Sequence, residues 1–455
     1  MLNLALTFPL VLSLAQSPSP SDTLEQERVV GALGTKLDAQ LTRFAEYGFW
    51  GSVLVVRDGK IALLKGYGLA DAERRIPNGA ATRFELNSMT KMFTGVAILQ
   101  LDAAGRLHVT DSVERYLGPF PAVKQGATIE QLASHTAGLI EAGADLAGDS
   151  RDAFVKDVKQ TPRESPPGEQ YRYTNAGYSL LAAIIEQVTG GSYEDYLVAY
   201  LFKPAGMRSA TFRDRLPQGD PRFARGYVGT PAQLQPGPPN PYVWGTRGAG
   251  GVWATVGDVY RWLLAVQGDS LLPTPQHRLL FSPPKPPSQE AYGWHVTTDS
   301  AGRPLIHKGG GSDDFASDML HYPRERVTII WASNNLRQRW RRTLNRTLSA
   351  LAFDNPGPPL PQVVSLPVGA LARQARLYRS GMDSLQLRAG SGYLYAESNQ
   401  LGVPTELMFF PQDTVHFTGF DPVSGNRSRL RFAKGSVTVE LPDGRILTAR
   451  ERGPY

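Results

Sequence analysis

The chain has 455 residues, enough to bury a sizeable core and to form more than one domain. Hydrophobic residues make up 41% and charged residues 20%, which is ordinary for a globular protein. The absence of cysteine excludes disulfides and thiolate metal sites, and the net charge of +6 accompanies no nucleic-acid-binding motif, so we expect no nucleic-acid partner.

The first residues resemble a secretory signal in their pattern. An apolar segment runs from Leu4 to Leu14, and Ser13-Leu14-Ala15 forms a small-x-small cleavage site. We expect residues 1–15 to be a signal peptide, residues 16–30 to be a linker, and the mature protein to be periplasmic or extracellular. The segment has no Lys or Arg before its apolar part, which leaves a misplaced start as an alternative. It is too short to span a bilayer, and no other stretch predicts an integral membrane span.

The next elements are a hairpin and a helix. Val53 to Val56 and Ile61 to Leu64, separated by Asp58-Gly59, predict two paired strands. The pattern from Asn87 to Leu101 then predicts a helix that ends near Gly105. Asn87 and Ser88 are predicted to form its N-cap.

Ser88-Met89-Thr90-Lys91 places a hydroxyl and an amine three residues apart, one turn from each other on the helix. A neutral Lys amine can take the proton of a Ser hydroxyl and so make it a competent nucleophile. About one S-x-x-K is expected by chance in a chain of this kind. Ser282-Pro283-Pro284-Lys285 is such a decoy, because two prolines exclude a regular helix interior. A capped core helix with an exposed Ser and Lys is the alternative for Ser88.

A helix- and loop-rich stretch from about 106 to 245 follows, and its loops near 140–165 and 208–245 are expected to form pocket walls. Within it, Tyr173-Thr174-Asn175 precedes an apolar helical run. A Tyr phenolate beside a Lys can act as a general base, and an Asn side chain can hold both a Lys and a substrate amide. A half-buried loop Tyr and a helix-capping Asn are the alternative. His135 is expected to pack or to cap a turn.

Strands return at about 303–308, 315–322 and 326–333, and a basic amphipathic helix is predicted at 338–352. The first of these strands ends in Leu305-Ile306-His307-Lys308-Gly309-Gly310-Gly311. A glycine-rich strand edge lets a substrate backbone approach closely, and its amides can face an oxyanion. A flexible hairpin loop is the alternative. We predict a mixed α/β (α+β) fold, with an antiparallel sheet flanked by helices and an all-helical insertion, and the active site between them.

A Pro-rich linker at 355–364 ends this unit, which we place at residues 31–354. Residues 365–455 then show short alternating strands with a clear turn at Pro442-Asp443-Gly444. They predict a small antiparallel β-barrel or sandwich. It could cover the active-site mouth, mediate dimerisation or do neither.

In their order and spacing, the three segments resemble the motifs of the penicillin-recognising, β-lactamase-related serine hydrolases, which are S-x-x-K, Ser/Tyr-x-Asn and Lys/His-x-Gly. The Tyr-x-Asn form is similar to class C β-lactamases, D-aminopeptidases, D-alanyl-D-alanine carboxypeptidases and family VIII esterases. The segments Leu132–Leu139 and Gly250–Thr255 are also similar to that family. The resemblance covers residues 40 to 350, and it implies a lipocalin-like character for the C-terminal domain, which some members carry.

The resemblance implies a division of roles. Ser88 would be the nucleophile, with Lys91 and Tyr173 sharing the proton transfers. Asn175 and the third motif would hold the substrate, and the amides of Ser88 and Gly310 would stabilise the oxyanion. Neither a metal ion nor an organic cofactor is implied. The partner is a small-molecule or peptide substrate, and the oligomeric state is left open.

The third motif has two possible registers. His307-Lys308-Gly309 has the His-x-Gly form, whereas Lys308-Gly309-Gly310 has the Lys-x-Gly form. Because successive strand residues point to opposite faces, only one register can present its first residue to the site. We favour His307, because it is the only His in the sequence that is followed two residues later by Gly. A His is mostly neutral at pH 7, so this register favours esters or uncharged amides over penicillins.

We therefore predict a serine hydrolase that forms an acyl-enzyme with an ester, a D-amino-acid amide or peptide, or a β-lactam. Esterase or D-peptidase activity is favoured, and a class C-like β-lactamase is the alternative. From a different class, a non-catalytic receptor that binds peptidoglycan or a partner with the same fold remains open. Such a receptor would be expected to lack the nucleophile, Lys or Tyr, and this chain has all three.

Overall fold

The computed structural model describes residues 24–451 with internal gaps. The gaps are 47, 122–125, 141–149, 229–233, 239–240, 283–287, 289, 336–337, 358–363, 365, 367–368, 382, 390–392, 397–406 and 421–426. The predicted signal peptide, residues 1–15, and residues 358–363 of the predicted Pro-rich linker lie outside the described residues. Among the described helices, none combines the length and the apolar character that crossing a bilayer requires.

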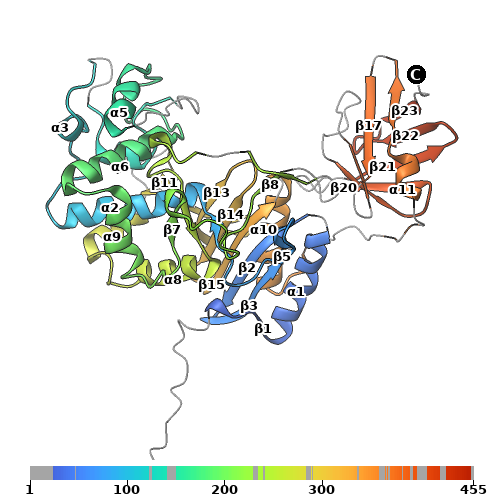
Figure 1. Cartoon of the computed structure of the whole chain (residues 1–455), viewed down its shortest axis with the longest axis horizontal. Helices are drawn as coiled ribbons and strands as arrows, with labels where there is room; N and C mark the ends of the chain where they lie inside the picture. The colour runs from blue at the N-terminus through green and yellow to red at the C-terminus, as the bar shows by residue number, and fades with distance from the viewer. Residues whose placement is uncertain are drawn as a thin grey trace, which may run out of the picture.

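An eight-stranded antiparallel sheet lies at the centre of the molecule (Figure 1). Its strand order is β1-β3-β2-β15-β14-β13-β12-β11, so the two ends of the hydrolase-like region meet in one sheet. The strands are β1 (Arg28–Val29), β2 (Trp50–Arg57), β3 (Lys60–Tyr67), β11 (Glu290–Ala291), β12 (Trp294–Thr298), β13 (Pro304–Gly311), β14 (Ala316–Tyr322) and β15 (Val327–Asn335). The predicted hairpin is confirmed, because β2 pairs with β3 and Asp58-Gly59 joins them with positive φ at both residues.

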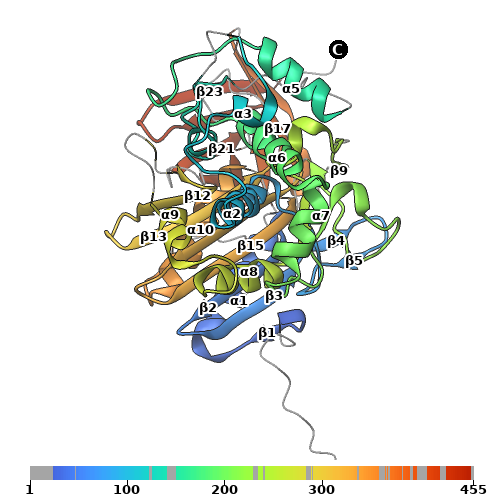
Figure 2. The ribbon, with the colours of Figure 1, turned by 90° about the vertical axis from the view of Figure 1, so that its left-hand side faces the viewer.

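The continuous apolar run in β2 reflects burial on both faces of the sheet. Leu54 and Val56 belong to the cluster that includes α2 (Thr90–Ala103) and α8 (Val256–Gln267). Val53 and Val55 belong to the cluster that includes α1 (Gly31–Glu46) and α10 (Gln338–Ala352). The sheet is therefore the middle layer between two helical layers, and Figure 2 shows α2 and α8 in front of it.

The insertion forms a helical lobe beside the sheet (Figure 1). Its helices, with one that follows it, are α3 (Glu114–Leu117), α4 (Ile129–Ala133), α5 (Arg151–Gln160), α6 (Asn175–Thr189), α7 (Tyr193–Leu197) and α9 (Thr274–Leu280). Short strands also occur around and within it: β4 (Leu69–Asp71), β5 (Ile76–Pro77), β6 (Phe84–Glu85), β7 (Thr211–Phe212), β8 (Tyr227–Val228), β9 (Gln235–Pro236) and β10 (Val252–Ala254). The small sheet β6-β10-β7 ties the lobe to the chain just before Ser88.

The C-terminal strands close into an eight-stranded antiparallel barrel. They are β16 (Leu377–Ser380), β17 (Asp383–Ala389), β18 (Leu394–Ala396), β19 (Met408–Pro411), β20 (His416–Phe420), β21 (Arg427–Ala433), β22 (Ser436–Glu440) and β23 (Ile446–Glu451), preceded by α11 (Ala370–Gln374). Of the predicted alternatives, the structure is thus a barrel and not a sandwich. The barrel lies at the opposite end of the molecule from the helical lobe (Figure 1).

Candidate active site

Ser88 lies in a short 3-10 turn, Asn87–Met89, that runs directly into α2. The predicted N-cap is wrong, because neither Asn87 nor Ser88 makes a capping side-chain hydrogen bond to the helix. The preceding chain is instead held by tertiary pairing, with the Leu86 amide donating to the carbonyl of Val252 in β10. Asn87 has a φ of 50°, a conformation that non-glycine residues seldom adopt. The nucleophile candidate therefore occupies a tightly constrained turn.

Lys91 brings the first two motifs together. Its side chain is fully buried, and its Nζ donates to Ser88 Oγ at 3.1 Å, to Asn175 Oδ1 at 2.7 Å and to the carbonyl of Ala249 at 3.1 Å. Oxygen atoms from three separate parts of the chain thus position the Lys91 nitrogen beside Ser88. The alternative of an exposed Lys on a core helix is therefore excluded.

The second motif lies at the start of α6. Thr174 is the N-cap, and its Oγ accepts from the Gly177 amide at 3.4 Å, so Asn175 is the first residue of the helix and does not cap it. Tyr173, immediately before the cap, is 37% exposed. Its ring centre lies 4.9 Å from Lys91 Nζ and 5.4 Å from Lys308 Nζ. Both amines therefore border the same phenol ring.

In β13, Lys308 and not the favoured His307 lies on the face toward Ser88, although both residues line a cavity that reaches Ser88. In β13, Lys308 pairs with Met319 of the cluster that contains α2, whereas His307 pairs with Leu320 of the cluster that contains α10. A side chain at Gly310 would meet Ser88 N at 2.9 Å, so Lys308 shares the Ser88 face of the strand. His307 points to the opposite face, because the strand alternates with a period of two.

The glycines of β13 are required by close approach. A Cβ at Gly310 would lie 2.0 Å from the Leu86 carbonyl oxygen, and a Cβ at Gly309 would lie 1.4 Å from an Nη atom of Arg341. Any larger residue at either position would push β13 away from the Ser88 turn or displace Arg341. The alternative of a flexible hairpin loop is excluded, because these glycines lie within a paired strand.

A buried charge cluster lies behind the Tyr173 ring. The Lys308 ammonium donates to Glu290, His135 Nε2 lies 3.6 Å from Glu290 Oε1, and His295 Nδ1 lies 2.6 Å from Oε2. Burial by itself would raise the pKa of Glu290, but Lys308 and the two imidazoles outweigh it, so this pKa lies well below its usual range. Burial lowers the pKa of His135 to about 4 in spite of the nearby carboxylate. The cluster thus pairs the Lys308 cation with an ionised carboxylate.

His135 packs, as expected, but it packs within the site. Its ring lies 4.4 Å from that of Tyr173, and its Nδ1 accepts from the Thr174 amide at 3.2 Å. Glu290 and His295 were not among the predicted site residues. Both belong to the short strands β11 and β12 near the far edge of the sheet, and nothing in their local sequence marks them as neighbours of Lys308.

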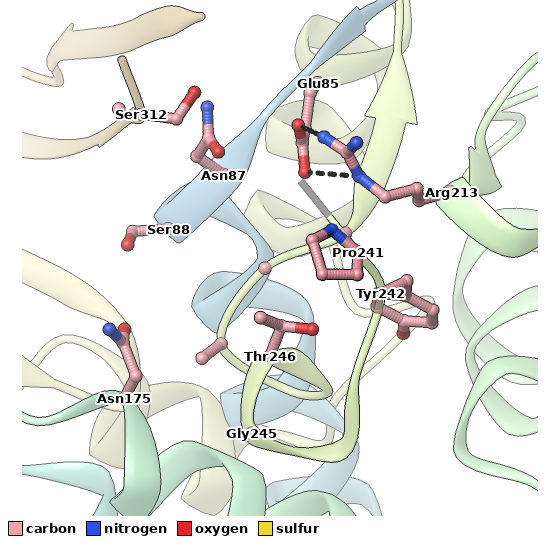
Figure 3. Close-up of a pocket in the computed structure, with 14 residues that line it drawn as sticks. Glu85, Asn87, Ser88, Asn175, Arg213, Pro241, Tyr242, Gly245, Thr246 and Ser312 are labelled. Atoms are coloured by element: carbon pink, nitrogen blue, oxygen red, sulfur yellow. Dashed lines mark hydrogen bonds and ion pairs between the residues drawn. The ribbon is translucent and has the colours of Figure 1, made fainter. Parts of the chain in front are cut away.

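Two cavities meet at Ser88. The smaller, of about 220 Å³, lies between the Ser88 turn and residues 241–246 and includes Asn175, Glu85 and Arg213 (Figure 3). The larger, of about 540 Å³, includes Tyr173, His307 and Lys308. The predicted pocket wall at 208–245 thus contributes residues to the smaller cavity, whereas part of the other predicted wall, 141–149, lies outside the described residues.

Comparison with known proteins gives consistent matches. Residues 41–353 match the family model described as Beta-lactamase. The chain is 30% identical over 312 residues to Penicillin-binding protein 4* of Bacillus subtilis (strain 168), covering 64% of this chain and 69% of that protein. It is 33% identical over 241 residues to the putative penicillin-binding protein PbpX of the same strain, covering 52% of this chain and 60% of that protein.

Two solved structures illustrate the likeness in fold. The octameric penicillin-binding protein homologue from Pyrococcus abyssi aligns with a TM-score of 0.65 at 19% identity, over 91% of this chain and 99% of that chain. The β-lactamase/D-alanine carboxypeptidase from Pseudomonas syringae aligns with a TM-score of 0.61 at 20% identity, over 71% of this chain and 99% of that chain. At these identities the likeness shows the shared fold alone.

Proposed function

Because the chain belongs to the β-lactamase family, whose members are generally serine hydrolases, we propose that it hydrolyses its substrate through an acyl-enzyme at Ser88. One observation carries the proposal. The Nζ atom of the fully buried Lys91 lies 3.1 Å from Ser88 Oγ and is positioned by Asn175 and the Ala249 carbonyl. A nucleophile and a proton acceptor within hydrogen-bond reach, with the acceptor oriented by a third group, are what covalent catalysis requires.

In the proposed mechanism, Ser88 Oγ attacks the substrate carbonyl while its proton passes to the Lys91–Tyr173 pair. The oxyanion is stabilised by the Ser88 amide and by a glycine amide of β13. The His307 register placed that amide at Gly310, and the shift to Lys308 moves it one residue on, to Gly311. Tyr173 then protonates the leaving group, and water releases the acid by the reverse path.

The shift of register also changes the argument about substrate. The preference for esters rested on a neutral His307 at the third motif. With Lys308 on the Ser88 face, a cation is present, but Glu290 pairs with it. We therefore propose an ester or a D-amino-acid amide or peptide as substrate, with β-lactams as the alternative. A panel of p-nitrophenyl esters, D-aminoacyl anilides, D-Ala-D-Ala peptides and nitrocefin tests this order. Nitrocefin as the best substrate would favour the alternative.

Covalent labelling tests the proposed function itself. A fluorophosphonate or a fluorescent penicillin should label the protein, and peptide mapping should find the adduct on Ser88. Ser88→Ala should abolish labelling. Ser282→Ala is the matched control, because Ser282 is exposed, is also followed three residues later by Lys, and its Oγ donates to the Arg278 carbonyl of its own turn. Labelling that survives Ser88→Ala, or that is lost in Ser282→Ala, would overturn the proposal.

We further propose that the protein is exported, as the apolar segment in residues 1–15 suggests. Expression in a bacterial host should yield a processed protein outside the cytoplasm whose N-terminus follows Ala15. An unprocessed protein confined to the cytoplasm would contradict export.

A further inference from the structure

The two cavities that meet at Ser88 differ in which motif they contain. Asn175 lines the smaller cavity, and Tyr173 lines the larger one. In acyl transfer only the leaving group needs a proton as it departs, so its atom must lie beside the proton donor. If Tyr173 is that donor, the leaving group occupies the larger cavity. The acyl group, which stays on Ser88, then extends into the smaller cavity past Asn175.

The wall of the smaller cavity opposite Ser88 is an ion pair (Figure 3). Arg213 donates to both carboxylate oxygens of Glu85, with Nε at 3.3 Å from Oε1 and an Nη contact to Oε2. The Glu85 side chain is 3% exposed and that of Arg213 is 20% exposed, so the guanidinium still reaches the cavity. The pair is held by the small sheet, since Glu85 pairs with Trp253 and Arg213 follows β7.

This wall has consequences for the acyl group. An apolar acyl chain would remove water from the ion pair without replacing its hydrogen bonds, and such desolvation is costly. A substituent that can hydrogen-bond would replace the lost water. The pair carries no net charge, so the wall does not select for a charged acyl group.

Several glycines line the side of the cavity, and at one of them, Gly250, close packing does not require a glycine. A Cβ at Gly250 would meet no atom nearer than the Thr246 carbonyl oxygen at 3.8 Å, and Gly250 does not have a positive φ. A Cβ atom would therefore fit the fold at this position. The glycine keeps space free in a cavity of only about 220 Å³, enough for a short acyl group.

From this geometry we infer that the smaller cavity is the acyl subsite, and that it selects short acyl groups carrying a hydrogen-bonding substituent. The inference rests on the proposed acyl-enzyme at Ser88 and names the substrate class for that site. Long fatty acyl groups are excluded by the ion-paired end wall, and bulk is accepted on the leaving-group side, where the cavity is larger.

The first experiment varies the acyl group with p-nitrophenol as a constant leaving group. Acetate, butyrate, octanoate and methoxyacetate esters are compared as kcat/KM divided by the rate constant for hydroxide hydrolysis, which removes intrinsic reactivity. Methoxyacetyl and butyryl groups have nearly the same size and differ in one ether oxygen. Methoxyacetate should exceed butyrate by about tenfold, a typical effect of a specific contact in a binding pocket, and octanoate should be the poorest substrate.

Two variants locate the effect. Gly250→Val should lower kcat/KM for butyrate about tenfold more than for acetate, because the added methyl groups occupy the acyl space. Gly191→Val is the matched control, since nothing lies within 4 Å of its Cβ position, and it should leave the acyl series unchanged. Glu85→Met together with Arg213→Met removes both charges at once and should reduce the preference for methoxyacetate over butyrate. Should the double variant fail to fold, the Gly250→Val result decides alone.

The outcomes separate this inference from the proposed function. Mass spectrometry of quenched turnover should find the acyl group on Ser88 for acetate and methoxyacetate. An acyl-enzyme on Ser88 with equal turnover of acetate and octanoate, or with Gly250→Val slowing all acyl groups equally, would overturn the acyl-subsite inference and leave the hydrolase intact. The absence of any acyl group on Ser88 would overturn both.

Discussion

Lys91 is fully buried, and its Nζ is held beside Ser88 by contacts with Ser88 Oγ, Asn175 Oδ1 and the Ala249 carbonyl. Two explanations fit this arrangement: a group that carries a proton, or a fixed positive charge. They differ in what an arginine would do at the same position, because Arg keeps its charge but cannot give up its proton.

We expect Lys91→Met to reduce esterase kcat by several orders of magnitude, as loss of one member of a catalytic unit commonly does. Lys91→Arg should be almost as inactive. Met keeps the unbranched length and a good helix propensity, so its melting temperature should change little. Steady-state kinetics and thermal melting of both variants are the measurements. A folded Lys91→Arg protein with near wild-type turnover would show that Lys91 supplies charge alone.

Lys308 and Glu290 form a buried ion pair, with side chains 1% and 0% exposed. Removing only the Lys308 cation should leave the buried carboxylate without its ammonium partner, which costs about 3–5 kcal/mol of unfolding free energy. We therefore expect Lys308→Met to be strongly destabilised and Lys308→Met with Glu290→Gln to recover much of the loss. Urea denaturation of the single and double variants measures this. Equal stability of the two would mean that the pair is not closed in solution.

His321, which lies away from the candidate site, should make the stability of the fold depend on pH. It lies in β14 against Thr328 and Gln267, and burial lowers its pKa from the ordinary 6.5 to about 4. Between these values the unfolded chain binds the proton and the folded chain does not, so stability falls as the pH drops below 6.5. From pH 7 to pH 5 this single group should cost about 1–2 kcal/mol. His321→Gln should make the urea-derived stability correspondingly less pH-dependent, and an unchanged slope would contradict the assignment.

At the scale of elements, helix α2 is positioned by the turn between β11 and β12. A Cβ at Gly95 would lie 1.9 Å from the Tyr292 carbonyl oxygen, and a Cβ at Gly293 would lie 2.4 Å from the Lys91 carbonyl oxygen. Backbone therefore packs directly on backbone one turn beyond Lys91. This contact links the Glu290 end of the sheet to the helix that starts at Ser88.

Gly95→Ala distinguishes this contact from simple helix propensity. Propensity alone would make alanine about 1 kcal/mol more stable in a helix interior. The close contact should instead make the variant about 1–3 kcal/mol less stable, since an inserted methyl group forces backbone shifts. Denaturant midpoints of Gly95→Ala and of the open control Gly191→Ala measure the difference. A stabilised Gly95→Ala protein would show that the helix and the turn are not in contact.

At the scale of the whole molecule, strands β18 and β19 of the barrel are buried on both faces. Leu394 and Phe409 belong to the barrel core. Tyr395 and Phe410 belong to the buried cluster that also contains Leu320 and residues of α10. In contrast, β21 alternates between exposed and buried residues, as a strand with a solvated outer face does. The barrel is therefore docked on the hydrolase domain through the outer face of β18 and β19.

Phe409 and Phe410 are both fully buried neighbours that serve different interfaces. Phe409→Ala should cost the barrel about 3–5 kcal/mol of stability. Phe410→Ala should leave the barrel folded but loosen its docking. Limited proteolysis with mass analysis should release an intact barrel from the Phe410 variant, whereas the Phe409 variant should lose the barrel to degradation. Identical digestion of the two variants would argue against separate interfaces.

The features that could be predicted from sequence are those that neighbouring residues specify. The spacing of Ser88 and Lys91 on a helix, the β2–β3 hairpin with its Asp58-Gly59 turn, and the helix at 338–352 depend on periodicity and turn chemistry within a few residues. The order of the three motifs indicated the β-lactamase-related family, and the match of residues 41–353 to the family model confirms that family. The N-cap at Asn87 was wrong because pairing with β10, distant in sequence, holds the chain there.

Tertiary structure decided the rest, because it brings together residues that sequence spacing does not connect. The choice between His307 and Lys308 depends on which face of β13 meets the Ser88 turn. The sequence allows the motif to start at either residue, and the two starting points lie on opposite faces of the strand. Glu290 reaches Lys308 across the sheet, and Glu85 reaches Arg213 across 128 positions of the chain. Local sequence thus determined which chemical groups the site could use, whereas packing of the sheet and the lobe decided which of them meet and in what electrostatic environment.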